Sequence, residues 1–305
     1  GYINLGSVKN VVSYVNINND KYGSQVTHAG GIIGSVGNDK TDIEKCMYYG
    51  NIHLNNSSDC IGGVIAYSNG GARVKNCANL GTVTATQSGA YVGGILGYLN
   101  NTNPTIENCY NYAKISDNDS GSHCGAIIGW ARNFNKSNIS NNYYNKDTGN
   151  TPFGTDSKLG LSANEKTISE FKCGEVAFKL NNGVTDGTQA WYQNIDNGLT
   201  PDDYPVFNGG TVYYADFDNT YSNFERTPDE FDKDDDGRFI IKTYSDLVKL
   251  SQVVRTDYKR YGDKNYILVN NIYADENSSW AQGIGSVAEN KPFNGTFDGN
   301  GYSIG

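Results

Sequence analysis

Three aspartates at alternate positions form the most metal-like pattern in the chain. Asp232, Asp234 and Asp236 precede Gly237, as in the first half of a calcium-binding loop. The glutamate expected at the twelfth loop position is replaced by Thr243. Such an acidic run is also typical of a solvated linker. Calcium at these three aspartates is one hypothesis, and a linker that binds no cofactor is the alternative.

The cysteines are spaced as a column and not as a metal motif. Cys46, Cys77 and Cys109 recur at steps of 31 and 32 residues, and none belongs to a CxxC pair. Zinc sites use closely spaced ligand pairs, and an odd number of cysteines cannot pair completely. Buried cysteine also behaves as a small hydrophobic residue. We therefore expect buried free thiols, which do not indicate a redox compartment.

No grouping of residue types in the sequence indicates catalysis. The histidines His28, His53 and His123 belong to no Ser/His/Asp or Cys/His arrangement. Glycoside hydrolysis needs two neighbouring carboxylates, whereas Glu44 and Glu107 occupy equivalent positions two repeats apart. We expect a protein that is not an enzyme, and a polysaccharide-active enzyme is the alternative.

Two series of mostly aromatic residues recur at a common spacing. The first series is Tyr14, Tyr49, Leu80 and Tyr112, and the second is Ser35, Tyr67, Tyr98 and Trp130. On stacked parallel strands, successive rings would lie about 4.8 Å apart. Flat aromatic stripes suit the faces of sugars or a partner protein. The aromatic members are therefore candidate ligand-binding residues, and the alternative is that they stack on one another or pack beneath loops.

These columns depend on an internal repeat. One segment type has an apolar residue, two variable residues and Val, Cys or Asn, and its fourth position falls at residues 11, 46, 77, 109 and 142. A second type, Gly-Gly-Ile-Ile-Gly and variants, begins at residues 30, 62, 93 and 125. The steps are 35, 31, 32 and 33 residues in the first track and 32, 31 and 32 in the second. Units of this length share their core with their neighbours.

The residues inside each repeat favour strands. Apolar residues alternate with polar ones, so that Ile17, Ile52, Val83 and Ile115 should point inward. Paired glycines are unfavourable inside helices and indicate bends or close backbone approach. The sequence predicts an all-β fold, a parallel β-helix (solenoid), and the general rule for parallel crossovers makes it right-handed.

The repeat occupies only part of the chain. We expect β-helix coils over 1–147, a mixed α/β C-terminal cap over 148–213, an acidic linker over 214–237 and the opening segment of a following β-helix over 238–305. Uncapped strand edges favour strand addition, which predicts head-to-tail self-stacking between the first and last strands.

Sequence signals for helix N-termini occur in the predicted cap and in the predicted opening segment. Thr167 and Glu170 have capping-box spacing ahead of an apolar stretch that Gly174 interrupts. Thr243 and Asp246 repeat that spacing, and apolar residues then follow at helical intervals.

The glycine-rich segments at 30–34, 62–66, 93–97 and 125–129 resemble the GLUG motif of bacterial cell-surface proteins. Residues 293–304 resemble the segment that opens such arrays, and 174–207 the segment that often closes one. The resemblance implies a surface or secreted adhesin-like protein. Some members carry a metallopeptidase domain with His-Glu-x-x-His, and the lack of this motif here means that no protease activity is implied.

The composition limits the kinds of partner that the protein can bind. A net charge of -9 argues against nucleic-acid binding, and no apolar run approaches the length that spans a membrane. The start without Met suggests a piece of a longer chain. We expect a noncatalytic extracellular bacterial module for adhesion or structural display, whose partner is a host or cell-surface glycan or protein. A carbohydrate-binding or carbohydrate-processing β-helix is the alternative.

Overall fold

The computed structural model describes residues 1–18, 27–55, 59–100, 104–118, 123–132, 138–154, 163–196, 200–216, 219–225, 229–274 and 283–305. The chain forms two compact units, Gly1–Arg226 and Thr227–Gly305.

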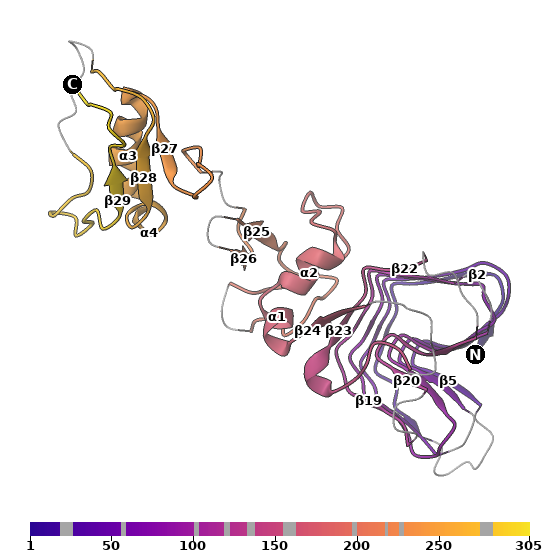
Figure 1. Ribbon diagram of the computed structural model, residues 1–305. Coiled ribbons are helices and arrows are strands. Elements are labelled where there is room, and N and C mark those ends of the chain that lie inside the picture. The colour runs from indigo at the N-terminus through magenta and orange to yellow at the C-terminus, as the bar shows by residue number, and fades with distance from the viewer. Residues whose placement is uncertain are drawn as a thin grey trace. The chain divides into compact units, whose positions relative to one another are not determined.

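Parallel sheets dominate the first unit, and successive repeats add successive strands to each sheet (Figure 1). Sheet A consists of β1 (Tyr2–Ile3), β6 (Ile33–Val36), β11 (Ile65–Ser68), β16 (Leu96–Leu99) and β21 (Ile128–Ala131). Sheet B consists of β2 (Gly6–Lys9), β7 (Thr41–Glu44), β12 (Ala72–Lys75), β17 (Thr105–Glu107) and β22 (Ile139–Ser140). Sheet C consists of β3 (Val12–Ser13), β8 (Met47–Tyr48), β13 (Ala78–Asn79), β18 (Tyr110–Asn111), β23 (Tyr143–Asn145) and β24 (Asn164–Lys166).

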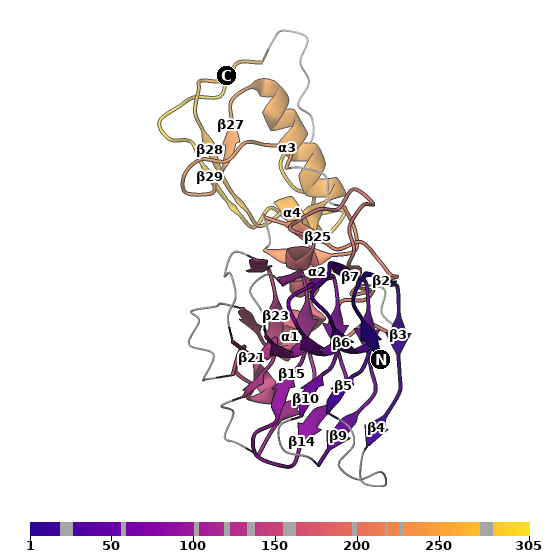
Figure 2. The same ribbon diagram turned by 90° about the vertical axis from the view of Figure 1, so that its right-hand side faces the viewer.

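Two four-stranded parallel sheets contain the remaining strands of the repeats, and Figure 2 shows several of these strands side by side. Sheet D consists of β4 (Ile17–Asn18), β9 (Ile52–Leu54), β14 (Val83–Ala85) and β19 (Ile115–Ser116). Sheet E consists of β5 (His28–Gly30), β10 (Cys60–Gly62), β15 (Tyr91–Gly93) and β20 (Cys124–Gly125).

The pairing register follows the sequence repeat. Along sheet B, Val8 pairs with Ile43, Ile43 with Val74, Val74 with Ile106, and Ile106 with Ile139. These partners are separated by the same 35, 31, 32 and 33 residues that separate the motifs. The predicted parallel stacking of the repeats is therefore confirmed.

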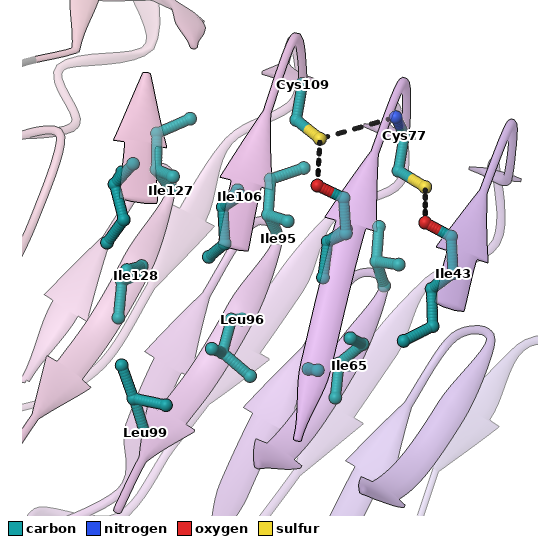
Figure 3. Close-up of a cluster of buried hydrophobic side chains, with 14 of the residues drawn as sticks. Ile43, Ile65, Cys77, Ile95, Leu96, Leu99, Ile106, Cys109, Ile127 and Ile128 are labelled. Atoms are coloured by element: carbon teal, nitrogen blue, oxygen red, sulfur yellow. Dashed lines mark hydrogen bonds between the residues drawn. The ribbon is translucent and has the colours of Figure 1, made fainter. Parts of the chain in front are cut away.

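Equivalent residues form layers in the interior. Cys46, Cys77 and Cys109 are fully buried in one core cluster, together with the isoleucine column of sheet B. The Cys77 thiol donates to the Ile43 carbonyl at 3.6 Å, and the Cys77 backbone amide donates to the Cys109 sulfur at 3.4 Å (Figure 3). Among the described residues every cysteine is a free thiol, as expected, and Cys173 is the exposed one.

The glycine-rich motifs mark places where backbones approach closely. A Cβ atom on Gly62 would collide with the Ile65 carbonyl, and one on Gly63 would collide with the Gly94 carbonyl. Only glycine permits this packing. The expectation of tight bends or close approach is therefore confirmed.

A left-handed turn follows each strand of sheet B. Asn10, Lys45, Asn76, Asn108 and Asn141 all have φ between 51° and 56°. Asparagine tolerates this conformation better than other side chains that carry a Cβ. The asparagine column is explained by these turns, and Lys45 occupies one of them despite the steric cost.

The segment after the last coil packs mainly on the outer face of sheet C. It contains the 3-10 helix η2 (Lys146–Thr148), α1 (Ile168–Lys172) and α2 (Glu175–Leu180). Phe171 and Trp191 are fully buried against Tyr110 of sheet C. β24 extends the same sheet, so the segment predicted to be a cap covers a side of the coils as well as a strand edge.

The beginning of the predicted acidic linker has regular structure. β25 (Tyr213–Ala215) and β26 (Thr220–Ser222) form an antiparallel pair, and Tyr214 and Tyr221 both contact Phe178 of α2. Contacts among these three rings help to order this part of the chain, although its composition is rich in turn residues.

The second unit is a three-stranded parallel sheet with helices between its first two strands. Its elements are β27 (Phe239–Ile241), α3 (Tyr244–Thr256), α4 (Tyr258–Tyr261), β28 (Asn265–Leu268) and β29 (Thr296–Asp298). Thr243 forms the predicted capping box with Asp246. Tyr266 pairs with Phe297, a separation of 31 residues that matches one coil of the first unit. Among the helices in the described ranges, none has the length and apolarity needed to cross a membrane.

Candidate functional site

The second aromatic series forms a continuous stack on sheet A. Ser35 pairs with Tyr67, Tyr67 with Tyr98, and Tyr98 with Trp130. The Tyr67 and Tyr98 rings stack with centroids 5.5 Å apart, and the Tyr98 and Trp130 rings at 5.0 Å. All three rings are partly exposed. The structure thus gathers three of the predicted ligand-binding residues, and we name this stack with its flanking rings the aromatic ladder.

Sheet E contributes flanking rings that the sequence analysis missed. His28 stacks on Tyr67 with centroids 4.7 Å apart. Tyr91 packs edge-on against Tyr98 at 4.7 Å, and it contacts His123 at 4.8 Å. The sequence contains a pattern that would have found them, because each lies two positions before the first glycine of a glycine-rich motif.

The aromatic ladder carries neutral polar groups. Burial raises the pKa of both Tyr67 and Tyr98, so their hydroxyls stay protonated, and the Tyr67 hydroxyl donates to Asn69 Oδ1 at 3.2 Å. Burial lowers the pKa of His28, whose Nδ1 lies 2.7 Å from the Ser35 hydroxyl oxygen. The alternative that rings stack on one another describes this series, so the ladder presents ring edges and uncharged hydrogen-bonding groups at its rims.

The first aromatic series has a different environment. Tyr14 and Tyr49 stack with centroids 5.0 Å apart, but Tyr204 lies 6.4 Å from Tyr49 and 5.1 Å from Tyr112. Phe171 also packs edge-on against Tyr112. Tyr14 is 69% exposed, whereas Tyr49 and Tyr112 lie beneath the segment after the coils. The alternative that rings pack beneath loops therefore describes Tyr49 and Tyr112.

The aspartates of the predicted calcium loop are engaged with cations of the protein. Asp234 accepts hydrogen bonds from Arg238 Nε and the Arg238 backbone amide, both at 2.8 Å. Asp232 pairs with Lys242, and Asp236 lies 3.4 Å from Arg238. Within the described ranges, no three His, Cys, Asp or Glu side chains are grouped as metal ligands. Calcium binding there stays a prediction, and it would require the ion to displace Arg238 from Asp234.

Comparisons of the chain with protein-family models, with curated proteins and with solved structures find no match.

Proposed function

We propose that the first unit is a right-handed parallel β-helix of the GLUG-repeat type. In this proposal it is a noncatalytic, extracellular module of a bacterial surface protein and acts in adhesion. The aromatic ladder carries the proposal, because it is a rigid, partly exposed row of stacked rings held by parallel strands.

A glycan is the partner that suits this surface best. The exposed edges of the stacked rings can pack against the C–H groups of a sugar, and the Tyr98 hydroxyl at the rim can hydrogen-bond to a sugar hydroxyl. The stacked centroids lie 5.0 and 5.5 Å apart, so the rings form one unbroken strip. Because the strip is neutral, it favours an uncharged glycan chain. A host protein with an exposed apolar surface is the second partner that the ladder could accept.

The test is a binding survey against immobilised neutral glycans with matched ring deletions. Tyr98→Ala and Trp130→Ala each remove one ring of the ladder, and we expect each to weaken binding about tenfold. Tyr14→Ala is the matched control, because it removes an exposed ring outside the ladder. Unchanged binding in the Tyr98→Ala, Trp130→Ala double variant would refute the proposal. Release of reducing ends from a bound polysaccharide would instead support the carbohydrate-processing alternative.

A further inference from the structure

A pocket lies between the left-handed turns after sheet B and the loop that follows α2. Its volume is about 280 Å³, just below the range of about 300–1,000 Å³ that is usual for small-molecule pockets. Its size suits one ring-sized ligand. The coils and the loop both contribute to its lining, which includes Lys45, Lys75, Asn76, Asn108, Asn182 and Val184.

One amide in the lining of this pocket has no hydrogen-bond partner among the described residues. Asn76 is only 6% exposed, and no hydrogen bond joins its side chain to any other described residue. The equivalent amide of Asn108 accepts a hydrogen bond from Asn141 at 2.8 Å, so the general turn ladder does not explain the Asn76 side chain.

The remaining open groups are donors. The Asn108 and Asn182 oxygens both accept from Asn141, which leaves their amide hydrogens unused among the described residues. By contrast, Asn181 and Gln189 already form hydrogen bonds through both ends of their amides. The pocket therefore offers several donors and few acceptors.

The charges in the pocket favour an anion. The ammonium groups of Lys45 and Lys75 form no ion pair with any described residue. Glu44, the carboxylate in the lining, is paired with Lys9 at 3.0 Å. Two unpaired cations beside amide donors form the donor-rich surroundings that a carboxylate needs.

Part of the pocket lining is apolar. Val184 and Ala190 lie on the loop side beside polar residues of the same loop, and the lysines come from the coils. A ligand that fits this lining has an anionic group, several acceptor oxygens and an apolar C–H face. These features belong to a sugar ring that carries a carboxylate.

We propose that this pocket binds a single hexuronic acid residue, either free or as the end of an acidic glycan. The carboxylate contacts Lys45 and Lys75, the ring oxygens accept from the amides of Asn76, Asn108 and Asn182, and the C–H face packs on Val184. The site is separate from the aromatic ladder, so the inference stands independently of the proposed function.

Calorimetric titration of the whole chain with glucuronate and galacturonate tests the proposal, with glucose as the neutral probe. We expect saturable binding of at least one uronate, about tenfold or more tighter than glucose, because two charge-assisted contacts are added. The double variant Lys45→Asn, Lys75→Gln should weaken uronate binding at least about tenfold. Asparagine tolerates the left-handed backbone at position 45, so the variant should fold.

The matched control is the double variant Lys114→Gln, Lys146→Gln, which removes the same charge from exposed positions outside the pocket. It should bind uronate as the unmodified chain does, and so should Trp130→Ala, because that ring belongs to the ladder. Failure of both uronates to bind would overturn the proposal. Equal binding of glucose, equal binding of inorganic sulfate or an equal loss in the control would overturn it as well.

Discussion

The two aromatic columns of the first unit begin with the same sequence pattern and end in different surroundings. Both place rings on the outward side of parallel strands, and both stack at about the strand spacing. On sheet C, Tyr204 and Phe171 cover the rings of Tyr49 and Tyr112. On sheet A, Tyr67 and Trp130 stay partly exposed.

This difference shows that the alternation of residues along a strand determines which way a side chain points, but not whether it is exposed to solvent. An outward side chain is free only if no distant segment packs on it. On sheet C the covering segment includes Trp191, which donates from Nε1 to the Asn108 carbonyl at 3.2 Å. Trp191 lies on the covering segment and Trp130 lies in the ladder. Replacing each of them therefore allows the stability of the two regions to be compared.

The largest expected effect comes from truncating the covering tryptophan. Trp191 is fully buried among Tyr110, Phe207 and sheet C. Trp191→Ala should lower the free energy of unfolding by about 3–5 kcal/mol, because it leaves a large cavity. Trp130→Ala, in the partly exposed ladder, should cost less than about 1 kcal/mol. Urea denaturation followed by circular dichroism measures both, and similar losses would show that the two columns do not differ as described.

The second effect compares two asparagine pairs. The buried Asn79 amide donates to Asn111 Oδ1 at 2.7 Å and to the Gly81 carbonyl at 2.9 Å. Asn79→Ala should cost about 2–3 kcal/mol, because it leaves a buried acceptor unpaired. Asn69, near the aromatic ladder, accepts from Asn100 at the same 2.7 Å but is only partly buried. Asn69→Ala should cost about 1 kcal/mol or less, and a larger loss than in Asn79→Ala would contradict the role of burial.

The same contrast separates the features that the sequence alone predicts from those that it does not. The period, the cysteine column, the inward column of Ile17, Ile52, Val83 and Ile115, and the capping boxes at Thr167 and Thr243 all follow from local spacing. The structure has each of them. Coverage of sheet C depends on contacts between residues far apart in the chain, as when the Tyr110 hydroxyl donates to the Pro205 carbonyl. Local patterns contain no information on such contacts.

The pocket and the rings at the rim of the ladder could not be predicted from the sequence, for related reasons. The repeat predicts left-handed turns, but it cannot show that the Asn76 amide lacks the partner that Asn108 has. His28 and Tyr91 join the ladder because sheets A and E approach closely at the glycine-rich motifs. The spacing before each glycine was visible in the sequence, whereas the approach of the two sheets required the fold.

Acid should loosen the covered face below about pH 4.5. Partial burial raises the pKa of Glu170, but hydrogen bonds from Lys166 and Thr167 outweigh this and lower the pKa to about 2. A carboxylate with a lowered folded-state pKa stabilises the fold above its ordinary pKa of 4.5, and the contribution is lost as the pH falls from there towards 2.

Glu170→Gln should therefore flatten the stability profile between about pH 4.5 and 2. Thermal unfolding across this pH range, for the variant and the unmodified chain, measures the change. Asp186→Asn is a matched control, because Asp186 is an exposed acid of the same segment whose pKa is lowered by Thr188 and not by a lysine. An undiminished slope in Glu170→Gln would show that this carboxylate does not hold the covering segment.

The smallest effect comes from His28 on the exposed face. Its contribution to the stability of the fold also decreases as the pH falls. Burial against its neighbours lowers the pKa of His28 from 6.5, so the unfolded chain takes up a proton at a higher pH than the folded chain does. Stability from this group is present above pH 6.5 and falls as the pH drops through 6.5 to the lower folded-state pKa. Nuclear magnetic resonance titration of the His28 ring should give a pKa below 6.5, and Tyr67→Ala should raise it, because removing the stacked ring admits water. A His28 pKa that does not respond to Tyr67→Ala would mean that the stack does not shield the imidazole, and the end of the aromatic ladder would then be open to solvent.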